Sequence, residues 1–301
     1  MKTAVIGPGA MGLLYGAKLS QVAEIVLIGN NEKHTEQINE NGITIKRDNN
    51  SCHYPVKAFL GGSYKEKVNL IIMFTKAYLT EEALLQNKEI IGKDTVILTL
   101  QNGAGHENVL RKFTDDEHIL IGTTQQGSYR ENAYTIVNSG LGETAIGSLS
   151  PKFPNKEKYC ELFKRGGFPC IYNDDIYKMI WNKLMINASS SVLSGVLQVN
   201  QGYIAENTDA WEMCKKLIGE ICDTASAAGY DFDKEEQYRR IYEHLKNAPT
   251  GYTSIYADLK NGRKTEVDYI SGTVARIAAD NGINVPYQKE IIEKVHCMER
   301  G

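Results

Sequence analysis

A glycine-rich segment near the N-terminus limits the fold of this 301-residue chain more than any other feature. It directly follows the short apolar run 2–6 and opens a stretch with apolar residues at helical spacing. Its residues are Gly7, Pro8, Gly9, Ala10, Met11 and Gly12. In a strand-to-helix turn, the three glycines allow a tight turn, the approach of a pyrophosphate and close helix packing, while helix N–H groups face the anion. The segment therefore predicts a dinucleotide-binding unit, in preference to a turn that binds nothing.

Apolar runs that alternate with helical segments extend this pattern. The runs occupy 24–28, 69–74, 95–100 and 118–122. Segments 31–41 and 79–91 have helical character, and each is closed by a glycine. Strands that alternate with helices are typical of parallel βαβ units.

The pattern changes at residue 125. Short strands with turn glycines at Gly140 and Gly142 fill 125–149, which predicts an antiparallel addition at one edge of the sheet. A further helix is expected after Pro151 and Pro154, and 169–172 is predicted as the last strand.

The rest of the chain is predicted to be helical. No proline interrupts Cys170 to Ala248, which favours consecutive helices. The expected helices span 174–197, 208–228, 234–246, 254–260, 265–281 and a last segment after Pro286. We therefore expect an α/β Rossmann domain with a mostly parallel sheet over 1–173, followed by an all-α domain over 174–301.

Composition excludes several classes of function. Lys plus Arg number 34 against 37 Asp plus Glu, so the chain lacks the basic excess that nucleic-acid binding requires. No stretch reaches the roughly 18 apolar residues of a membrane helix, and the N-terminus does not read as a signal peptide. The six cysteines form no C-x-x-C pair, so we expect neither a disulfide framework nor a metal site. These features predict a cytoplasmic protein.

The residue after the second strand bears on cofactor choice. A Rossmann unit that prefers NAD has an acidic residue there, and one that prefers NADP has a nearby Arg. This chain has Asn30, which can bond either ribose form. The choice between NAD and NADP must therefore depend on neighbours such as Lys33, His34 or Lys76. The motif leaves NAD and NADP open.

Polar side chains at two strand ends and on two helices are candidate site residues. Lys76 and Asn102 follow the runs 69–74 and 95–100, where ligands of open parallel sheets bind. Lys183, Asn187 and Ser191 stand at steps of four, which predicts one helix face. Each has an ordinary alternative: a surface lysine, an Asn-Gly turn or a solvated helix face. The pair Thr265 and Asp268 can likewise form a capping box.

These motifs in this order resemble the ketopantoate reductase (2-dehydropantoate 2-reductase) family. The resemblance spans nearly the whole chain and implies a Rossmann domain followed by a helical domain. It rests on Gly7–Gly12, Thr75-Lys76, Gln101-Asn102-Gly103, Trp181-Asn182-Lys183-Leu184 with Asn187, Thr265 to Ile270, and Gly282 to Pro286.

The resemblance implies roles for individual residues. Lys183 matches the catalytic lysine that protonates the ketone oxygen, and Glu266 matches the acid that bonds the substrate hydroxyl. Further matches are Asn187 and Ser254 as substrate-binding positions, and Lys76 and Asn102 beside the cofactor and the active site. Two residues depart from the family pattern: Ser191 replaces an Asn of some members, and Asn30 replaces an Arg of many NADP-using members.

The leading hypothesis is a reductase that converts 2-dehydropantoate to (R)-pantoate, on the way to pantothenate and coenzyme A. The expected cofactor is NADPH, with NADH as the alternative because of Asn30. A second hypothesis, motivated by Asn30 and Ser191, is an NAD-dependent D-2-hydroxyacid dehydrogenase of the same family. A third is a non-catalytic dinucleotide sensor. We expect a small 2-oxo acid as the binding partner, and neither nucleic acid nor a membrane. The sequence does not decide whether the protein forms a homodimer.

Overall fold

The computed structural model describes residues 1–300, which fold as two compact units. The α/β unit comprises 1–101 and 106–176. The helical unit comprises 102–105 and the chain from Tyr177 onward. The predicted fold class, a mostly parallel α/β domain followed by an all-helical one, is confirmed.

The α/β unit is built on an eight-stranded sheet in the order β12-β11-β8-β7-β6-β1-β2-β5. Strands β5, β2, β1, β6, β7 and β8 are parallel, whereas β11 runs antiparallel to β8 and pairs in parallel with β12. The strands are β1 (Lys2–Ile6), β2 (Glu24–Gly29), β5 (Lys57–Leu60), β6 (Leu70–Met73), β7 (Val96–Thr99), β8 (Ile119–Thr124), β11 (Thr144–Ser148) and β12 (Cys170–Tyr172). Because the chain runs outward from β1 in both directions, the carboxyl end of β1 lies at a topological switch point, where such sheets bind ligands.

The expectation for 125–149 was only partly right. β11 is the predicted antiparallel strand, but two others join a separate four-stranded sheet in the order β4-β3-β10-β9. Its strands are β3 (Ile43–Arg47), β4 (Asn50–Tyr54), β9 (Gly127–Arg130) and β10 (Thr135–Gly140). Strands β3, β4 and β5 were not predicted, because all three are short and β4 is almost wholly exposed.

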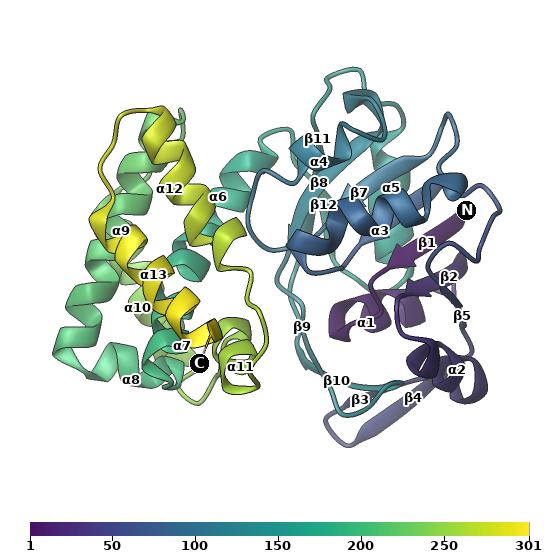
Figure 1. The fold of residues 1–301 in the computed structure, drawn as a ribbon, viewed down its shortest axis with the longest axis horizontal. Helices are drawn as coiled ribbons and strands as arrows, with labels where there is room; N and C mark the ends of the chain where they lie inside the picture. The colour runs from purple at the N-terminus through teal and green to yellow at the C-terminus, as the bar shows by residue number, and fades with distance from the viewer. Residues whose placement is uncertain (301) are drawn as a thin grey trace. The chain divides into compact units, whose positions relative to one another are not determined.

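Helices cover both faces of the large sheet (Figure 1). They are α1 (Ala10–Leu19), α2 (Glu32–Asn41), α3 (Thr80–Gln86), α4 (Glu107–Leu110) and α5 (Lys156–Arg165), with 3₁₀ turns η1 (Ala77–Leu79), η2 (Lys88–Ile90) and η3 (Asp116–His118). α1 and α5 share one core with the strands. In it the Tyr15 ring stacks on Phe168 at 4.1 Å between ring centres, and its hydroxyl bonds Thr124 Oγ1 at 2.8 Å. α1 is therefore fixed at its middle, which holds its N-terminus at the end of β1.

The helical unit surrounds the long helix α9, which packs against α8, α10, α12 and α13. Its elements are α6 (Ile176–Ile186), the π-helical turn η4 (Asn187–Ser191), α7 (Val192–Leu197), α8 (Gln201–Glu206), α9 (Thr208–Ala227), α10 (Lys234–Asn247), α11 (Ser254–Lys260), the 3₁₀ turn η5 (Val267–Tyr269), α12 (Ser271–Asp280) and α13 (Pro286–Arg300). Two predicted helices are interrupted, 174–197 by η4 and 265–281 at Ile270, whose ψ of −88° is not helical. α8 was not predicted.

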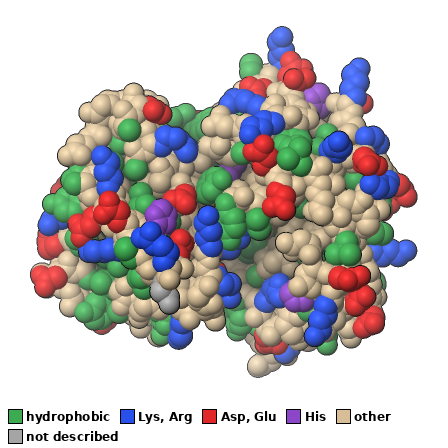
Figure 2. All heavy atoms as spheres, in the orientation of Figure 1, with side chains coloured by type: hydrophobic (Ala, Val, Ile, Leu, Met, Phe, Trp, Pro, Cys, Tyr) green, Lys and Arg blue, Asp and Glu red, His purple; other side chains and the backbone are tan. Residues whose placement is uncertain are grey.

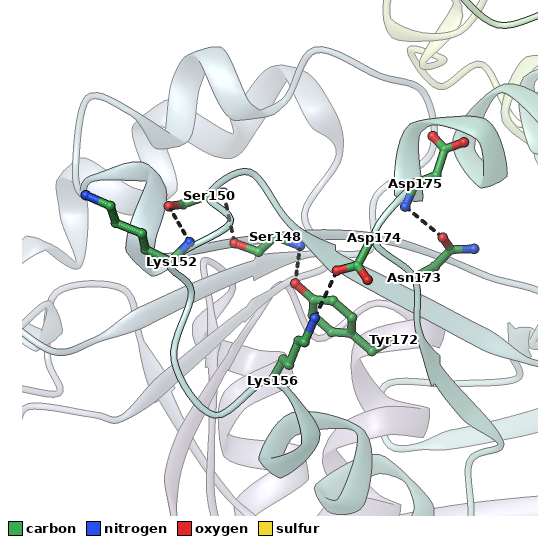
Figure 3. A network of polar contacts seen from close by, with 8 residues as sticks. All are labelled: Ser148, Ser150, Lys152, Lys156, Tyr172, Asn173, Asp174 and Asp175. Atoms are coloured by element: carbon green, nitrogen blue, oxygen red, sulfur yellow. Dashed lines mark hydrogen bonds and ion pairs between the residues drawn. The ribbon is translucent and has the colours of Figure 1, made fainter.

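A polar network fixes the chain where it passes from β12 into α6 (Figure 3). The side chain of Asn173 accepts a hydrogen bond from the Asp175 N–H at 2.8 Å, forming an Asx turn that starts the helix. Lys156 Nζ donates to Asp174 at 3.0 Å and lies 4.6 Å from the centre of the Tyr172 ring. The start of α6 is thus set by side chains of the segment before it.

The surface of the described residues is of mixed charge. Figure 2 shows Lys and Arg side chains interspersed with Asp and Glu on the face drawn. In residues 1–300, no helix has the length and apolar character needed to cross a membrane. All six cysteines are free thiols.

Candidate active site

The predicted phosphate-binding segment Gly7–Gly12 lies between β1 and the first turn of α1. Gly7 has φ +97°, and a Cβ there would lie 2.5 Å from the backbone N of Thr75. At Gly12 a Cβ would lie 2.1 Å from the carbonyl oxygen of Gly7. A Cβ on Gly9, by contrast, would meet no atom within 4 Å, so the space above this residue is open. Two glycines are therefore required by packing, and the third leaves room for a ligand to approach the backbone.

The start of α1 suits an anion. Its N-cap, Gly9, provides no side-chain hydrogen bond to the helix, and the first turn contains no acidic residue. The first N–H groups of a helix lack partners within it and carry a partial positive charge. These residues fit the pyrophosphate of a dinucleotide cofactor.

Charges of both signs lie just beyond the carboxyl end of β2, with Glu32 and Lys33 in the first turn of α2. Asn30 is exposed there, and the neighbouring Asn31 caps α2 by accepting the His34 N–H at 2.9 Å. The pKa of His34 is lowered by partial burial and by the charges of Arg130 and Lys33. Arg130 was not predicted to act here, because it lies 96 residues from His34 in the sequence and no local pattern indicates such a contact.

A buried amide ties two strand ends together. Gln101, which follows β7, is 7% exposed, and its Nε2 donates to the Thr75 carbonyl at 2.8 Å and to Thr80 Oγ1 at 2.8 Å. Lys76 lies between these two threonines, at the start of η1. The Gln101 side chain therefore fixes the loop that carries Lys76, beside the strand that carries Gly7.

The loop that carries Asn102 belongs to the helical unit. It comprises Asn102–Gly105. A Cβ on Gly103, whose φ is +95°, would lie 2.1 Å from the Tyr269 carbonyl. Thr273 Oγ1 donates to the Ala104 carbonyl at 3.1 Å. The loop of Asn102 is therefore held against η5 and α12. These two elements directly follow Glu266 in the chain.

Lys183 and Glu266 interact within the helical unit. Lys183 is partly buried on α6, and burial lowers the pKa of its ammonium to about 8, although the Glu266 charge acts in the opposite direction. Glu266 is 7% exposed. Its segment is fixed by Thr265, whose N–H and hydroxyl both donate to Glu299 of α13 at 2.7 Å. A lysine poised near neutral pH beside a buried carboxylate suits proton transfer.

The capping-box alternative for this segment is wrong. The Thr265 N–H bonds Glu299 and not Asp268, and Asp268 instead pairs with His296 at 2.9 Å. The turn that follows is also a three-residue 3₁₀ turn rather than the start of a long helix.

The stretch that carries Lys183, Asn187 and Ser191 is not one regular α-helix. The step from Lys183 to Asn187 follows α6, but the step from Asn187 to Ser191 runs through η4. A π turn has more residues than an α turn, so the helix after η4 is rotated relative to a continuous α-helix. Asn187 is partly buried, and Ser191 is 7% exposed.

The serine run favours a distorted helix at η4. Ser190 Oγ donates to the carbonyl of Ile186 at 3.2 Å, and Ser189 Oγ donates to the carbonyl of Met185. Such bonds to the carbonyl four residues earlier compete with the helical N–H and distort a helix.

Ser254 is joined to η4 by the preceding residue, Thr253. Thr253 Oγ1 accepts the Tyr256 N–H at 3.2 Å as the cap of α11 and donates to the Ser191 carbonyl at 3.0 Å. The exposed Ser254 therefore begins α11 beside Ser191. Asp258, one turn on, is bonded to Arg263 at 3.0 Å.

The candidate residues thus form two groups. Gly7–Gly12, Asn30 and Lys76 lie at the carboxyl ends of adjacent strands in the α/β unit. The helical unit contains Asn102, Lys183, Asn187, Ser191, Ser254 and Glu266. A dinucleotide-binding Rossmann unit joined to a lysine with a lowered pKa defines a class, the dinucleotide-dependent oxidoreductases that act on a carbonyl or an alcohol.

Comparison with known proteins identifies the family. The ketopantoate reductase PanE/ApbA model matches residues 3–151, and the model of the C-terminal part of the same family matches 175–299. The chain is 30% identical over 299 residues to a 2-dehydropantoate 2-reductase of Streptococcus pyogenes, with 98% of this chain and 97% of the relative covered. This chain therefore belongs to the ketopantoate reductase family of NAD(P)H-dependent 2-oxo acid reductases.

Two other relatives frame the range of the family. A 2-dehydropantoate 2-reductase of Pyrococcus abyssi is 31% identical over 288 residues, with 95% of this chain and 94% of the relative covered. A structure of D-mandelate dehydrogenase with NADH and anilino(oxo)acetate has a TM-score of 0.95 and 30% identity, with 100% of this chain and 99% of the other covered. Equal identity to two kinds of enzyme leaves the substrate of this chain to be argued from its own residues.

Proposed function

We propose that this protein reduces 2-dehydropantoate to (R)-pantoate, with Lys183 as the proton donor. One observation carries the proposal: Lys183 has a pKa of about 8 and lies within electrostatic reach of the buried Glu266. Both residues also occupy the positions that the family resemblance assigns to catalysis. The product would serve pantothenate and coenzyme A synthesis.

The proposed steps follow from the charges. When bound, a nicotinamide cofactor would supply the hydride that the carbonyl carbon accepts. The Lys183 ammonium donates a hydrogen bond to the carbonyl oxygen, stabilises the negative charge that develops there, and then transfers its proton. Glu266 accepts a hydrogen bond from the substrate hydroxyl and raises the pKa of Lys183, which keeps more of the lysine protonated at neutral pH.

The remaining candidates are assigned to binding. Asn187, Ser191 and Ser254 come from η4 and the start of α11, which Thr253 joins, and we propose that they bind the 2-oxo acid. Asn102 is proposed to contact both substrate and cofactor. In the α/β unit, Gly7–Gly12 are proposed to bind the pyrophosphate and Lys76 the adjacent part of the dinucleotide.

Charge around Asn30 supports NADPH. Lys33 and Arg130 both act on His34, one turn along the helix that Asn31 caps. These two cations would attract a 2′-phosphate bound at the end of β2, and the position that carries an acid in NAD-preferring units is Asn30, although Glu32 lies two residues further on.

A second candidate activity is the NADH-dependent reduction of a bulkier 2-oxo acid to a D-2-hydroxy acid. Two residues favour it: Ser191, which is smaller than the Asn of some family members, and Asn30, which lacks the positive charge of Arg. The likeness to D-mandelate dehydrogenase in complex with NADH points the same way.

A matched set of initial rates separates the two activities. Purified enzyme is assayed with 2-dehydropantoate, a branched 2-oxo acid and phenylglyoxylate, each with NADPH and with NADH. We expect the highest kcat/KM for 2-dehydropantoate with NADPH. A higher value for phenylglyoxylate or the branched acid with NADH would replace the proposal by the second activity.

A further inference from the structure

The π turn η4 begins at Asn187 and ends at Ser191, two residues of the proposed site, and it directly follows α6, which carries Lys183. π turns are rare and usually short, and they occur frequently at functional sites. Isolated, the turn would revert to the more stable α geometry, so the surrounding structure must hold it. The question is which residues do so.

Carbonyl groups along this segment accept hydrogen bonds from three other elements. Arg240 of α10 donates from Nη2 to the Asn182 carbonyl at 3.2 Å. Gln288 of α13 donates from Nε2 to the Ala188 carbonyl at 2.9 Å. The third donor is Thr253, which reaches the Ser191 carbonyl at 3.0 Å. The serines of the turn bond two more carbonyls, so the backbone is fastened before, within and after η4.

The two long donors are themselves held in place. Arg240 donates from Nε and Nη2 to the Gln237 side-chain oxygen at 2.9 Å and 2.7 Å, and Gln237 is 4% exposed. Gln288 is fully buried at the start of α13, where the Glu220 carboxylate accepts the N–H groups of Tyr287 at 2.9 Å and Gln288 at 2.7 Å. Further hydrogen bonds therefore hold the side chain of Arg240 and the backbone of Gln288.

We propose that Arg240 and Gln288 are positioning residues, which hold η4 in its π geometry and so set the direction of Lys183 relative to Asn187 and Ser191. The inference rests on the proposed role of Lys183. Asn182, whose carbonyl Arg240 bonds, directly precedes Lys183 in the chain, and Ala188, whose carbonyl Gln288 bonds, directly follows Asn187. Loss of either bond releases the turn toward α geometry and rotates the two halves of the site against each other.

The test uses Arg240→Met, Arg240→Lys and Gln288→Leu. Small displacements of catalytic groups cost roughly tenfold to a hundredfold in rate. We expect such a fall in kcat for 2-oxo acid reduction in Arg240→Met and Gln288→Leu, with the dissociation constant of the reduced cofactor unchanged. Arg240→Lys keeps a cationic donor and should recover most of the rate.

Thr95→Val provides a control for lost stability alone. Thr95 is buried in the α/β unit, and its hydroxyl donates to the Val68 carbonyl at 2.6 Å and accepts the Gly92 N–H at 2.8 Å. Removing this hydroxyl should lower the unfolding temperature and leave kcat near the wild-type value.

A second readout does not depend on turnover. The pH dependence of covalent labelling of Lys183, followed by peptide mass spectrometry, reports its pKa, which starts at about 8. Release of η4 should expose the ammonium and move this pKa upward in Arg240→Met and Gln288→Leu, but not in Thr95→Val. An unchanged kcat together with an unchanged Lys183 pKa in the first two variants would overturn the inference. If the wild type does not reduce any 2-oxo acid, the proposed function fails, while the labelling result still decides whether these residues hold Lys183.

Discussion

The two units build their parts of the site in different ways. In the α/β unit the requirement falls on the backbone: Gly7 needs a positive φ, and a side chain at Gly12 would collide with the Gly7 carbonyl at 2.1 Å. In the helical unit the requirement falls on side chains from separate segments, with Lys183 on α6 and Glu266 before η5. The phosphate-binding segment consists of consecutive residues and is therefore visible in the sequence. The pair Lys183 and Glu266 comes together only when segments that are distant in the sequence have packed.

The largest expected effect separates chemistry from cofactor binding. Replacement of Lys183 by Ala removes the proposed proton donor, which is worth about 100-fold to 10,000-fold in rate. We expect a fall in kcat of that size, measured by stopped-flow or steady-state oxidation of the reduced cofactor. Cofactor affinity, measured by fluorescence titration, should stay unchanged because the phosphate segment lies in the other unit.

Lys178→Ala is the matched control for this change. Lys178 lies on the same helix and is exposed, so its loss should leave both kcat and cofactor affinity at wild-type values. Wild-type turnover in Lys183→Ala would show that Lys183 is not the proton donor. Only the proposed cofactor-binding role of the α/β unit would then remain.

The next effect acts on the α/β unit. Gly12→Ala places a Cβ 2.1 Å from the Gly7 carbonyl, so the strand and α1 must move apart at the phosphate segment. We expect the dissociation constant of the cofactor to rise by at least about tenfold, as for the loss of about 1.4 kcal/mol of binding free energy. The unit should remain folded, because its core lies along the middle of α1.

Gly219→Ala tests whether replacing any helical glycine by alanine weakens cofactor binding as Gly12→Ala is expected to do. Gly219 lies within α9, and a Cβ there would meet only the Tyr238 hydroxyl, at 3.5 Å. This change should leave cofactor affinity unaltered and raise the free energy of unfolding by roughly 0.5–1 kcal/mol, the usual gain of Ala over Gly in a helix. Equal loss of binding in both variants would contradict the steric argument.

The same contrast explains what the sequence could predict. The alternation of strands and helices, the position of Gly7–Gly12 and most helices of the second unit follow from local patterns, and the structure confirms the fold class. β3 and β4 were missed because their stability comes from pairing β3 with β10, about 90 residues away, and not from an apolar run of their own.

The candidate site was predictable to a smaller extent. The steps of four predicted one helix face for Lys183, Asn187 and Ser191 but not the π turn that interrupts the helix. Gln288 bonds a carbonyl of that turn from one hundred residues away in the sequence, so no local pattern predicts this contact. Arg130 was missed for the same reason, since it lies 96 residues from His34 in the sequence.

The smallest effect is a shift along the pH axis, and it should appear in one unit only. The ammonium form of Lys183 must donate the proton, and its pKa is lowered to about 8 by burial. The kcat/KM for 2-oxo acid reduction should therefore be flat below that pH and fall about tenfold per unit above it. In the direction of alcohol oxidation the neutral amine accepts the proton, so the rate should rise through the same pH.

Glu266→Gln removes the charge that raises the pKa of Lys183, so the descending limb of the kcat/KM profile for reduction should move to lower pH. Cofactor affinity measured over the same range should show no matching step, since Lys183 belongs to the helical unit. A limb that stays in place in Glu266→Gln would mean that a group other than Lys183 controls the profile.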